Sequence, residues 1–250
     1  MPLKSDLLDA DASVYWAVSN LPMFEERLNA WVKENFCLDV KKNLENFEHD
    51  GLIAVQKEPI PLIFNAEAGA YINAIRSSLD ILATSIGARD GFTRHDKIYF
   101  PIANSPEHFY RRQFAGKEFF ESISKKHQAT IERLQPYYRG NTALFTLNKL
   151  DIMRKHRRLL TTQAGPTSLT YTGGDRELIF FGDIPETRTR RISGSEILLA
   201  YLGPGSKLPQ MSFVANVVFD EGDVLKGLGV VSMLRRFADI ANEVIGAFDF

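Results

Sequence analysis

The chain has 250 residues, of which 44% are hydrophobic and 24% charged, a composition typical of a globular protein with a sizeable core. Its net charge of −1 excludes a general basic coat for nucleic acid, so any nucleic-acid contact needs a local patch. The single cysteine, Cys37, excludes an internal disulfide and fits a reducing compartment. No apolar run has the length of a signal peptide or a membrane span, so we expect a cytoplasmic protein without a membrane segment.

The first quarter of the chain predicts a helix followed by a hairpin. Apolar residues at helical spacing cover residues 14–32, and Pro22 within them predicts either a kink or the start of a second helix. Further on, Asp50 and Gly51 lie between two extended-looking runs. An Asp-Gly pair in this position predicts the turn of a β-hairpin.

The middle of the chain predicts mainly helices. The clearest helix, from Glu67 to Gly87, carries one broad apolar stripe. Ser105 and Pro106 fit the cap and the first position of a further short helix. Two longer helices are expected over about residues 117–134 and 142–160.

After Gly165 the chain changes to short β-rich runs separated by Gly, Pro and Asp, and it ends in a helical stripe from Leu234 to Phe248. Helices and strands are segregated, which predicts an α+β fold. We expect a helical bundle packed with an antiparallel β-sheet, built from the N-terminal hairpin and the C-terminal strands, and a final C-terminal helix. The expected domain is single and covers 1–250, with helical parts at about 8–35, 60–160 and 223–250 and β parts at about 36–58 and 166–220.

The stretch NKLDIMRKHRRLL, residues 148–160, holds the densest group of charged side chains. Four basic residues and one histidine occupy positions 154–158. Asp151 and Lys155 form an i,i+4 pair with the acid first, the favourable order on a helix. Such a pair contributes only about 0.2–0.5 kcal/mol, so we interpret it as an ordinary surface feature.

His156 falls on the other side of this helix. A helical wheel places it toward the apolar face, beside Ile152, Leu159 and Leu160. One interpretation is a core histidine satisfied by a hydrogen bond, in which case His156→Ala damages folding. The other is a functional acid/base or a phosphate contact.

A polar strip borders the apolar stripe of the helix over residues 67–87. It consists of Asn73, Arg76 and Asp80, and Asp80 is expected to accept from Lys155 or His156. We therefore expect one polar cluster between two packed helices, made of Asn73, Arg76, Asp80, Lys155, His156 and Arg157. Either it is a structural network between helices or it is a site.

Four segments between Asn73 and Arg157 carry a resemblance to known proteins. They are NAIRSSLDILA (73–83), FPI (100–102), LQPY (134–137) and LNKLDIMRKHRRLL (147–160). In this order and spacing the chain resembles a widespread group of uncharacterised bacterial proteins that share an Arg-Ser-x-Leu-Asp helix and a helix ending in Lys-His-Arg. The later strands and the final helix also fit the layout of that group.

Two departures from the group's pattern concern the chemistry. Ile81 stands where the group commonly has His, and Arg154 stands where it commonly has an acid. With that His, the pattern is similar to the Arg-x4-His signature of HEPN-type ribonucleases, which work without metal. This resemblance implies a phosphate-binding Arg76 and an acid/base His156 that would substitute in space for the missing His.

The remaining sequence offers no other catalytic signature. The five histidines are scattered, no cluster has metal-ligand spacing, and no phosphate loop or nucleophile elbow is present, so neither metal nor cofactor is expected. The leading hypothesis is a non-catalytic binding or interaction module. The alternative is a metal-independent HEPN-like ribonuclease with Arg76 and His156 as catalytic residues. Partners compatible with the sequence are a second copy of the chain and RNA or another phosphate-bearing ligand.

Overall fold

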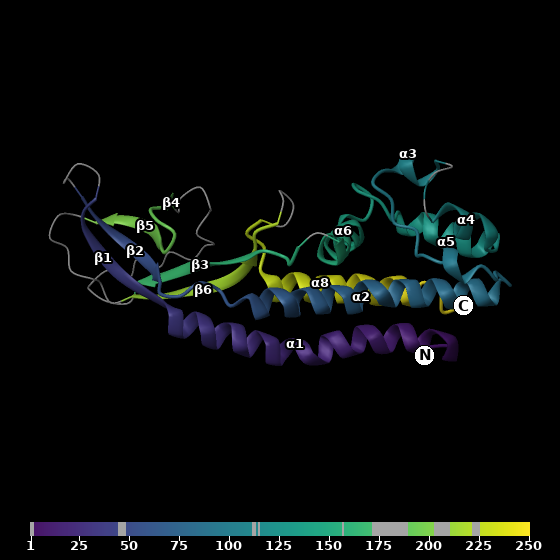
Figure 1. The fold of residues 1–250 in the computed structure, drawn as a ribbon, viewed down its shortest axis with the longest axis horizontal. Coiled ribbons are helices and arrows are strands. Elements are labelled where there is room, and N and C mark those ends of the chain that lie inside the picture. The colour runs from purple at the N-terminus through teal and green to yellow at the C-terminus, as the bar shows by residue number, and fades with distance from the viewer. Residues whose placement is uncertain are drawn as a thin grey trace. The chain divides into compact units, whose positions relative to one another are not determined.

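The structure is a computed structural model that describes residues 3–44, 49–111, 114, 116–156, 158–171, 190–202, 211–221 and 226–250. It is an α+β fold, as the sequence predicts (Figure 1). The chain divides into two compact units. Unit 1 contains Met1–Pro22, Asn65–Leu160 and Val231–Phe250, and unit 2 contains Met23–Phe64 and Thr161–Val230.

Helices dominate unit 1. The helical elements of the chain are η1 (Ser5–Leu7), α1 (Leu8–Asn35), α2 (Leu62–Arg89), η2 (His95–Lys97), α3 (Pro106–Phe109), α4 (Lys117–Ser122), α5 (Lys125–Leu134), α6 (Thr142–His156) and α8 (Val230–Gly246). α1 is continuous through Pro22, so the prediction that a second helix starts there is wrong. Its neighbours Leu21 and Phe24 are buried.

The middle helices differ from their predicted bounds. Ser105 caps α3 as predicted, since its side chain accepts from the His108 amide with Pro106 in the first turn. The helix expected over 117–134 is divided into α4 and α5, because Ile123 is extended and Ser124 caps α5 by accepting from the His127 amide. The helix expected over 142–160 is α6, which ends at His156, four residues before the predicted Leu160.

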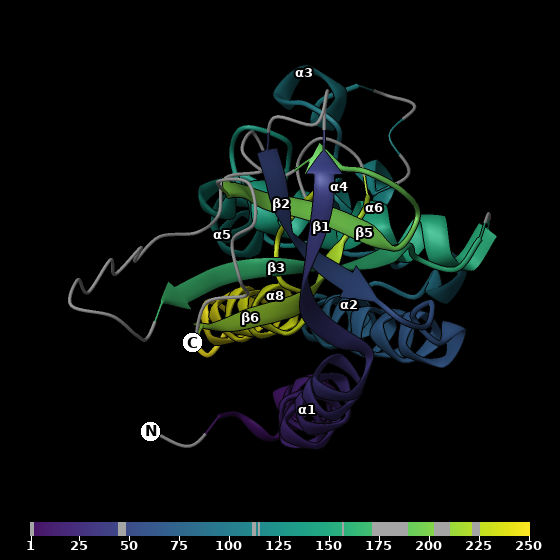
Figure 2. The same ribbon diagram turned by 90° about the vertical axis from the view of Figure 1, so that its left-hand side faces the viewer.

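All strands among the described residues belong to unit 2. They are β1 (Phe36–Leu44), β2 (His49–Gln56), β3 (Thr162–Tyr171), β4 (Arg190–Arg191), β5 (Glu196–Leu202) and β6 (Met211–Phe219). One antiparallel sheet has the order β1-β2-β5-β4, and β3 pairs with β6 in a second (Figure 2). The N-terminal hairpin therefore shares a sheet with C-terminal strands, as predicted. The run ELIFFG (177–182) lies outside the described residues.

The hairpin turns at a different place from the one predicted. Asp50 and Gly51 lie inside β2, where Gly51 pairs with Lys41 of β1, and residues 45–48 between the two strands lie outside the described part of the chain. Asp50 is buried, and its carboxylate accepts from the amide of Asn43, a residue with φ of 56°. The pairing of β1 with β2 shifts register between Lys41 and Leu44, and Asp50 bonds to Asn43 within this irregular stretch. The Asp-Gly pair therefore does not form the turn.

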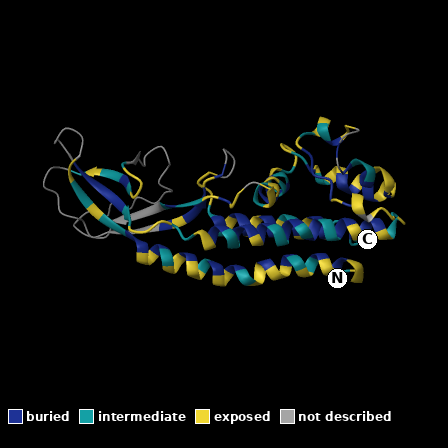
Figure 3. Cartoon of the chain, viewed as in Figure 1, coloured by how far each residue is buried: buried dark blue, intermediate teal, exposed yellow. Residues whose placement is uncertain are grey.

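The core of unit 1 is built on α2. The apolar stripe predicted for this helix is buried throughout, at Tyr71, Ile72, Ile75, Leu79, Leu82 and Ile86. Buried positions of the N-terminal part of α1 face α2 (Figure 3). Among the described residues, no helix is both long and apolar enough to cross a bilayer.

Arg89, at the end of α2, joins both ends of the chain. Its Nε and Nη2 donate to the two oxygens of Asp6 at 2.6 and 2.9 Å, and its Nη1 donates to the Phe248 carbonyl at 2.7 Å. The backbone amide of Lys4 also donates to Asp249. The bidentate hydrogen bonds from Arg89 hold the pKa of Asp6 below its ordinary value.

Leu79→Ala is expected to lower the free energy of unfolding by about 2–5 kcal/mol, because it removes a fully buried side chain from the centre of the α2 stripe. Leu62→Ala, at an exposed position of the same helix, is the matched control and should change it by less than about 0.5 kcal/mol. Urea denaturation of the three proteins measures both values. Equal midpoints for Leu79→Ala and the parent would contradict the core assignment.

Stability is expected to depend on the charge of Asp6. Because the folded pKa of Asp6 is lowered, its pairing with Arg89 stabilises the fold fully above the unfolded value of 3.8, and this contribution is lost as the pH falls through the folded pKa. Melting curves between pH 6 and pH 2.5 should show a smaller acid-induced decrease for Asp6→Asn than for the parent. Identical pH profiles would show that the Asp6–Arg89 pair does not contribute.

Candidate functional site

Arg76 connects α2 to two other segments of unit 1. The residue is 6% exposed. Nε donates to Asn148 Oδ1 of α6 at 2.8 Å, Nη1 to Asp80 Oδ1 at 2.7 Å, and Nη2 to the Phe100 carbonyl at 3.4 Å. Asp80 Oδ1 in turn accepts from the Phe100 amide at 3.0 Å. The Arg76–Asp80 pair therefore fixes both backbone polar groups of Phe100 and one side chain of α6.

A second contact between α2 and α6 lies at Asn73. Arg154 Nη2 donates to Asn73 Oδ1 at 2.7 Å. The stem of Arg154 lies against Gly69, where an added Cβ would come within 2.6 Å of Arg154 Cδ. Glycine in the middle of α2 therefore leaves the space that this arginine needs. These contacts confirm the predicted packing of the Arg76 helix against the helix that ends at His156.

Asp151 lies inside the cluster, although the sequence suggested a surface pair. It is 3% exposed, and its Oδ2 forms an ion pair with Lys155 at 2.6 Å. Its Oδ1 lies 3.5 Å from Arg154 Nη2. Oδ1 and Arg154 Nε are buried and have no hydrogen-bond partner among the described residues. A buried carboxylate requires nearby positive charge, which Arg154 and Lys155 supply from the same helix.

His156 does not occupy the position predicted for it. It is exposed at the last residue of α6, and two of its expected apolar neighbours, Ile152 and Leu159, are exposed as well. The interpretation as a buried core histidine is therefore wrong. Asp80 accepts from Arg76 and Phe100 in place of the expected Lys155 or His156, whereas Lys155 pairs with Asp151, as its i,i+4 spacing predicts. Arg157 lies outside the described residues.

The structure thus brings together Asn73, Arg76 and Asp80 with three residues that were not predicted for the cluster, namely Asn148, Asp151 and Arg154. A helical wheel does place Asn148, Asp151, Arg154 and Lys155 on one side of α6. That signal was available, but charged residues on one face are more often exposed than buried. The contact with α2 decided that this face points inward.

A further polar group, at His127, carried no sequence signal. His127 Nδ1 lies 2.6 Å from Asp90 Oδ2 and 3.0 Å from Ser124 Oγ. Burial raises the pKa of Asp90, but hydrogen bonds from His127 and from the Ser124 amide outweigh it, and the pKa lies below its ordinary value. Asp90 and Ser124 meet the same ring nitrogen. In a nucleophilic triad the acid and the hydroxyl contact opposite nitrogens, so this group fixes the start of α5 and does not activate Ser124.

Within the described part of the chain, no group of three or more His, Cys, Asp or Glu side chains is arranged to hold a metal ion. A scan against protein-family models found no match to the chain, and searches of curated proteins and of solved structures found none either. The resemblance to the bacterial group and to HEPN proteins therefore stays a prediction.

Opposite outcomes are expected at the two candidate catalytic residues. Arg76→Met leaves Asp80 and Asn148 without their buried donor and should reduce the free energy of unfolding by about 1–3 kcal/mol. His156→Ala alters an exposed position, and it should change the free energy of unfolding by less than about 0.5 kcal/mol. Chemical denaturation measures both. A larger loss at His156 than at Arg76 would reverse the assignment of the two residues.

Proposed function

We propose that the chain is a cytoplasmic bacterial protein that acts as a non-catalytic binding or interaction module, in which the polar cluster between α2 and α6 holds the helices together. The observation that carries the proposal is the environment of Arg76. All three of its side-chain nitrogens donate to protein oxygens at a position that is almost fully buried. Because its nitrogens already donate to the protein and the residue is shielded from solvent, this guanidinium positions the helices and is poorly available to an external phosphate.

The neighbouring charges support the same function. Arg154 donates to Asn73, and Lys155 pairs with the buried Asp151, so two of the basic residues in the stretch 154–158 compensate groups inside the protein. The ribonuclease alternative needs Arg76 and an acid/base histidine to face one substrate. His156 lies at the exposed end of α6, whereas Arg76 is bonded to Asn148, two helical turns earlier.

An RNA cleavage assay tests the proposal. Parent protein, His156→Ala and Lys149→Ala are incubated with mixed-sequence RNA in the presence of EDTA, and the products are resolved on a gel. Lys149→Ala is the control, because Lys149 is exposed on the same helix and lies outside the cluster. We expect no cleavage by any of the three beyond that of a mock purification.

The proposal is overturned if the parent and Lys149→Ala cleave RNA while His156→Ala does not, with all three melting at the same temperature. That result would assign acid/base chemistry to His156 and replace the binding module by a metal-independent nuclease.

A further inference from the structure

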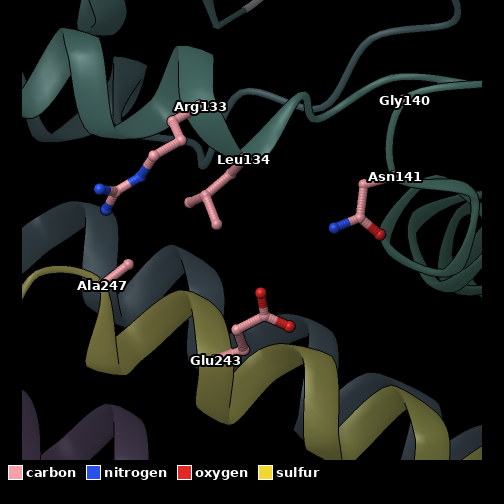
Figure 4. Close-up of a pocket in the computed structure, with 6 residues that line it drawn as sticks. All are labelled: Arg133, Leu134, Gly140, Asn141, Glu243 and Ala247. Atoms are coloured by element: carbon pink, nitrogen blue, oxygen red, sulfur yellow. The ribbon is translucent and has the colours of Figure 1, made fainter.

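A cleft in unit 1 lies between α5, the turn that follows it and α8. It is lined by Arg133, Leu134, Gly140, Asn141, Glu243 and Ala247, and its volume is about 510 Å³ (Figure 4). This volume falls within the range of sites that bind small molecules. The cleft lies at the N-terminal end of α6, whereas the cluster with Arg76 contacts its later turns.

The turn that forms one wall has a fixed geometry. The Gln135 carbonyl accepts from the amides of Tyr137 and Asn141, and Gln135 itself has φ of 48°. A Cβ on Gly140 would come within 2.7 Å of the Gln135 carbonyl oxygen, so only glycine fits there. Backbone hydrogen bonds therefore hold Gly140 and Asn141, the two lining residues of this turn.

Asn141 presents a hydrogen-bond donor to the cleft. Its Oδ1 accepts from the Leu144 amide and caps α6, which fixes the orientation of the side-chain amide. Figure 4 shows the nitrogen of this amide on the side of the open space and the oxygen turned toward the helix. The donor is thus positioned before any ligand arrives.

Two opposite charges line the same cleft without pairing with each other. Arg133 comes from α5 and Glu243 from α8, and neither forms a salt bridge with any described residue. In Figure 4 the Glu243 carboxylate points into the space below Leu134 and Asn141, and Arg133 extends over Ala247. Ala247 lies four residues beyond Glu243, about 6 Å along the helix. The two charged side chains therefore lie at different positions along α8, with Leu134 above the space between them.

We propose that this cleft binds a small aliphatic α-amino acid. Its carboxylate pairs with the Arg133 guanidinium, which suits bidentate recognition of a carboxylate. Its ammonium group pairs with Glu243, and its aliphatic side chain contacts Leu134 and Ala247. Because Arg133 and Glu243 are exposed, solvent weakens both ion pairs, and we expect weak, saturable binding of L-leucine.

This inference deepens the proposed binding function and rests on it, yet the two tests have separate outcomes. RNA cleavage that depends on His156 would overturn the binding-module proposal and leave L-leucine binding measurable. A failure to bind L-leucine would overturn this site alone.

The site is tested by titrating the ¹⁵N-labelled protein with three compounds. L-leucine carries both charges, 4-methylpentanoate lacks the amine, and isoamylamine lacks the carboxylate. We expect saturable chemical-shift changes at Gly140 and at the Asn141 side-chain amide with L-leucine, and affinities at least fivefold lower for the other two compounds. Equal shifts from all three compounds, or no saturable shift with L-leucine, would overturn the proposal.

Variants identify which residue recognises which charge. Arg133→Gln and Glu243→Gln should each weaken L-leucine binding about fivefold, and Glu243→Gln should also reduce the preference for L-leucine over 4-methylpentanoate. The matched controls are Arg94→Gln and Glu118→Gln, which remove the same charges from an exposed pair elsewhere in unit 1. Arg133, Glu243 and Arg94 are exposed and Glu118 is half-buried, so the variants should fold. L-leucine binding that is unchanged in Arg133→Gln and Glu243→Gln would overturn the assigned roles.

Discussion

The buried guanidinium of Arg76 is the constraint on which the organisation of unit 1 depends. Removing such a charge from water costs several kcal/mol unless its hydrogen bonds are replaced within the protein. Three segments supply the replacement, namely the next turn of α2, the backbone at Phe100 and Asn148 of α6. Each acceptor reaches the guanidinium only if its segment lies against α2. The need to satisfy the hydrogen bonds of Arg76 therefore fixes α6 and the Phe100 segment against this helix.

The inward face of α6 follows from the same requirement. Asn148 lies one turn before Asp151, so once Asn148 meets Arg76, Asp151 is also drawn toward α2. Arg154 and Lys155 then compensate the buried carboxylate, and Gly69 provides the space for the arginine stem. Arg154 and Lys155, two of the cations that look like a phosphate-binding patch in the sequence, are in this way paired with groups of the protein itself. This is why the chemistry of the stretch 148–160 supports docking of helices better than catalysis.

The two ends of α6 serve different purposes. At its start, Asn141 uses its oxygen to cap the helix and directs its nitrogen toward the cleft. At its later turns, the helix is docked on α2. A helix that is docked along its later turns also fixes the position of the residue that caps its start. The Arg76 cluster therefore helps to hold the wall of the cleft at Asn141, because both lie on α6.

The sequence by itself determined which segments are helical and which are strands, because these depend on local periodicity and on caps such as Ser105. It determined the buried stripe of α2 for the same reason, since the stripe from Tyr71 to Ile86 repeats at helical spacing and is buried. It could not determine which face of α6 is buried, because that helix has charged and apolar residues on competing faces. Only the contacts with Arg76 and Asn73 placed Asp151 inside and His156 outside. Nor could the sequence predict the cleft at Arg133 and Glu243, because these residues are 110 positions apart in the chain and meet only when α8 packs beside α5.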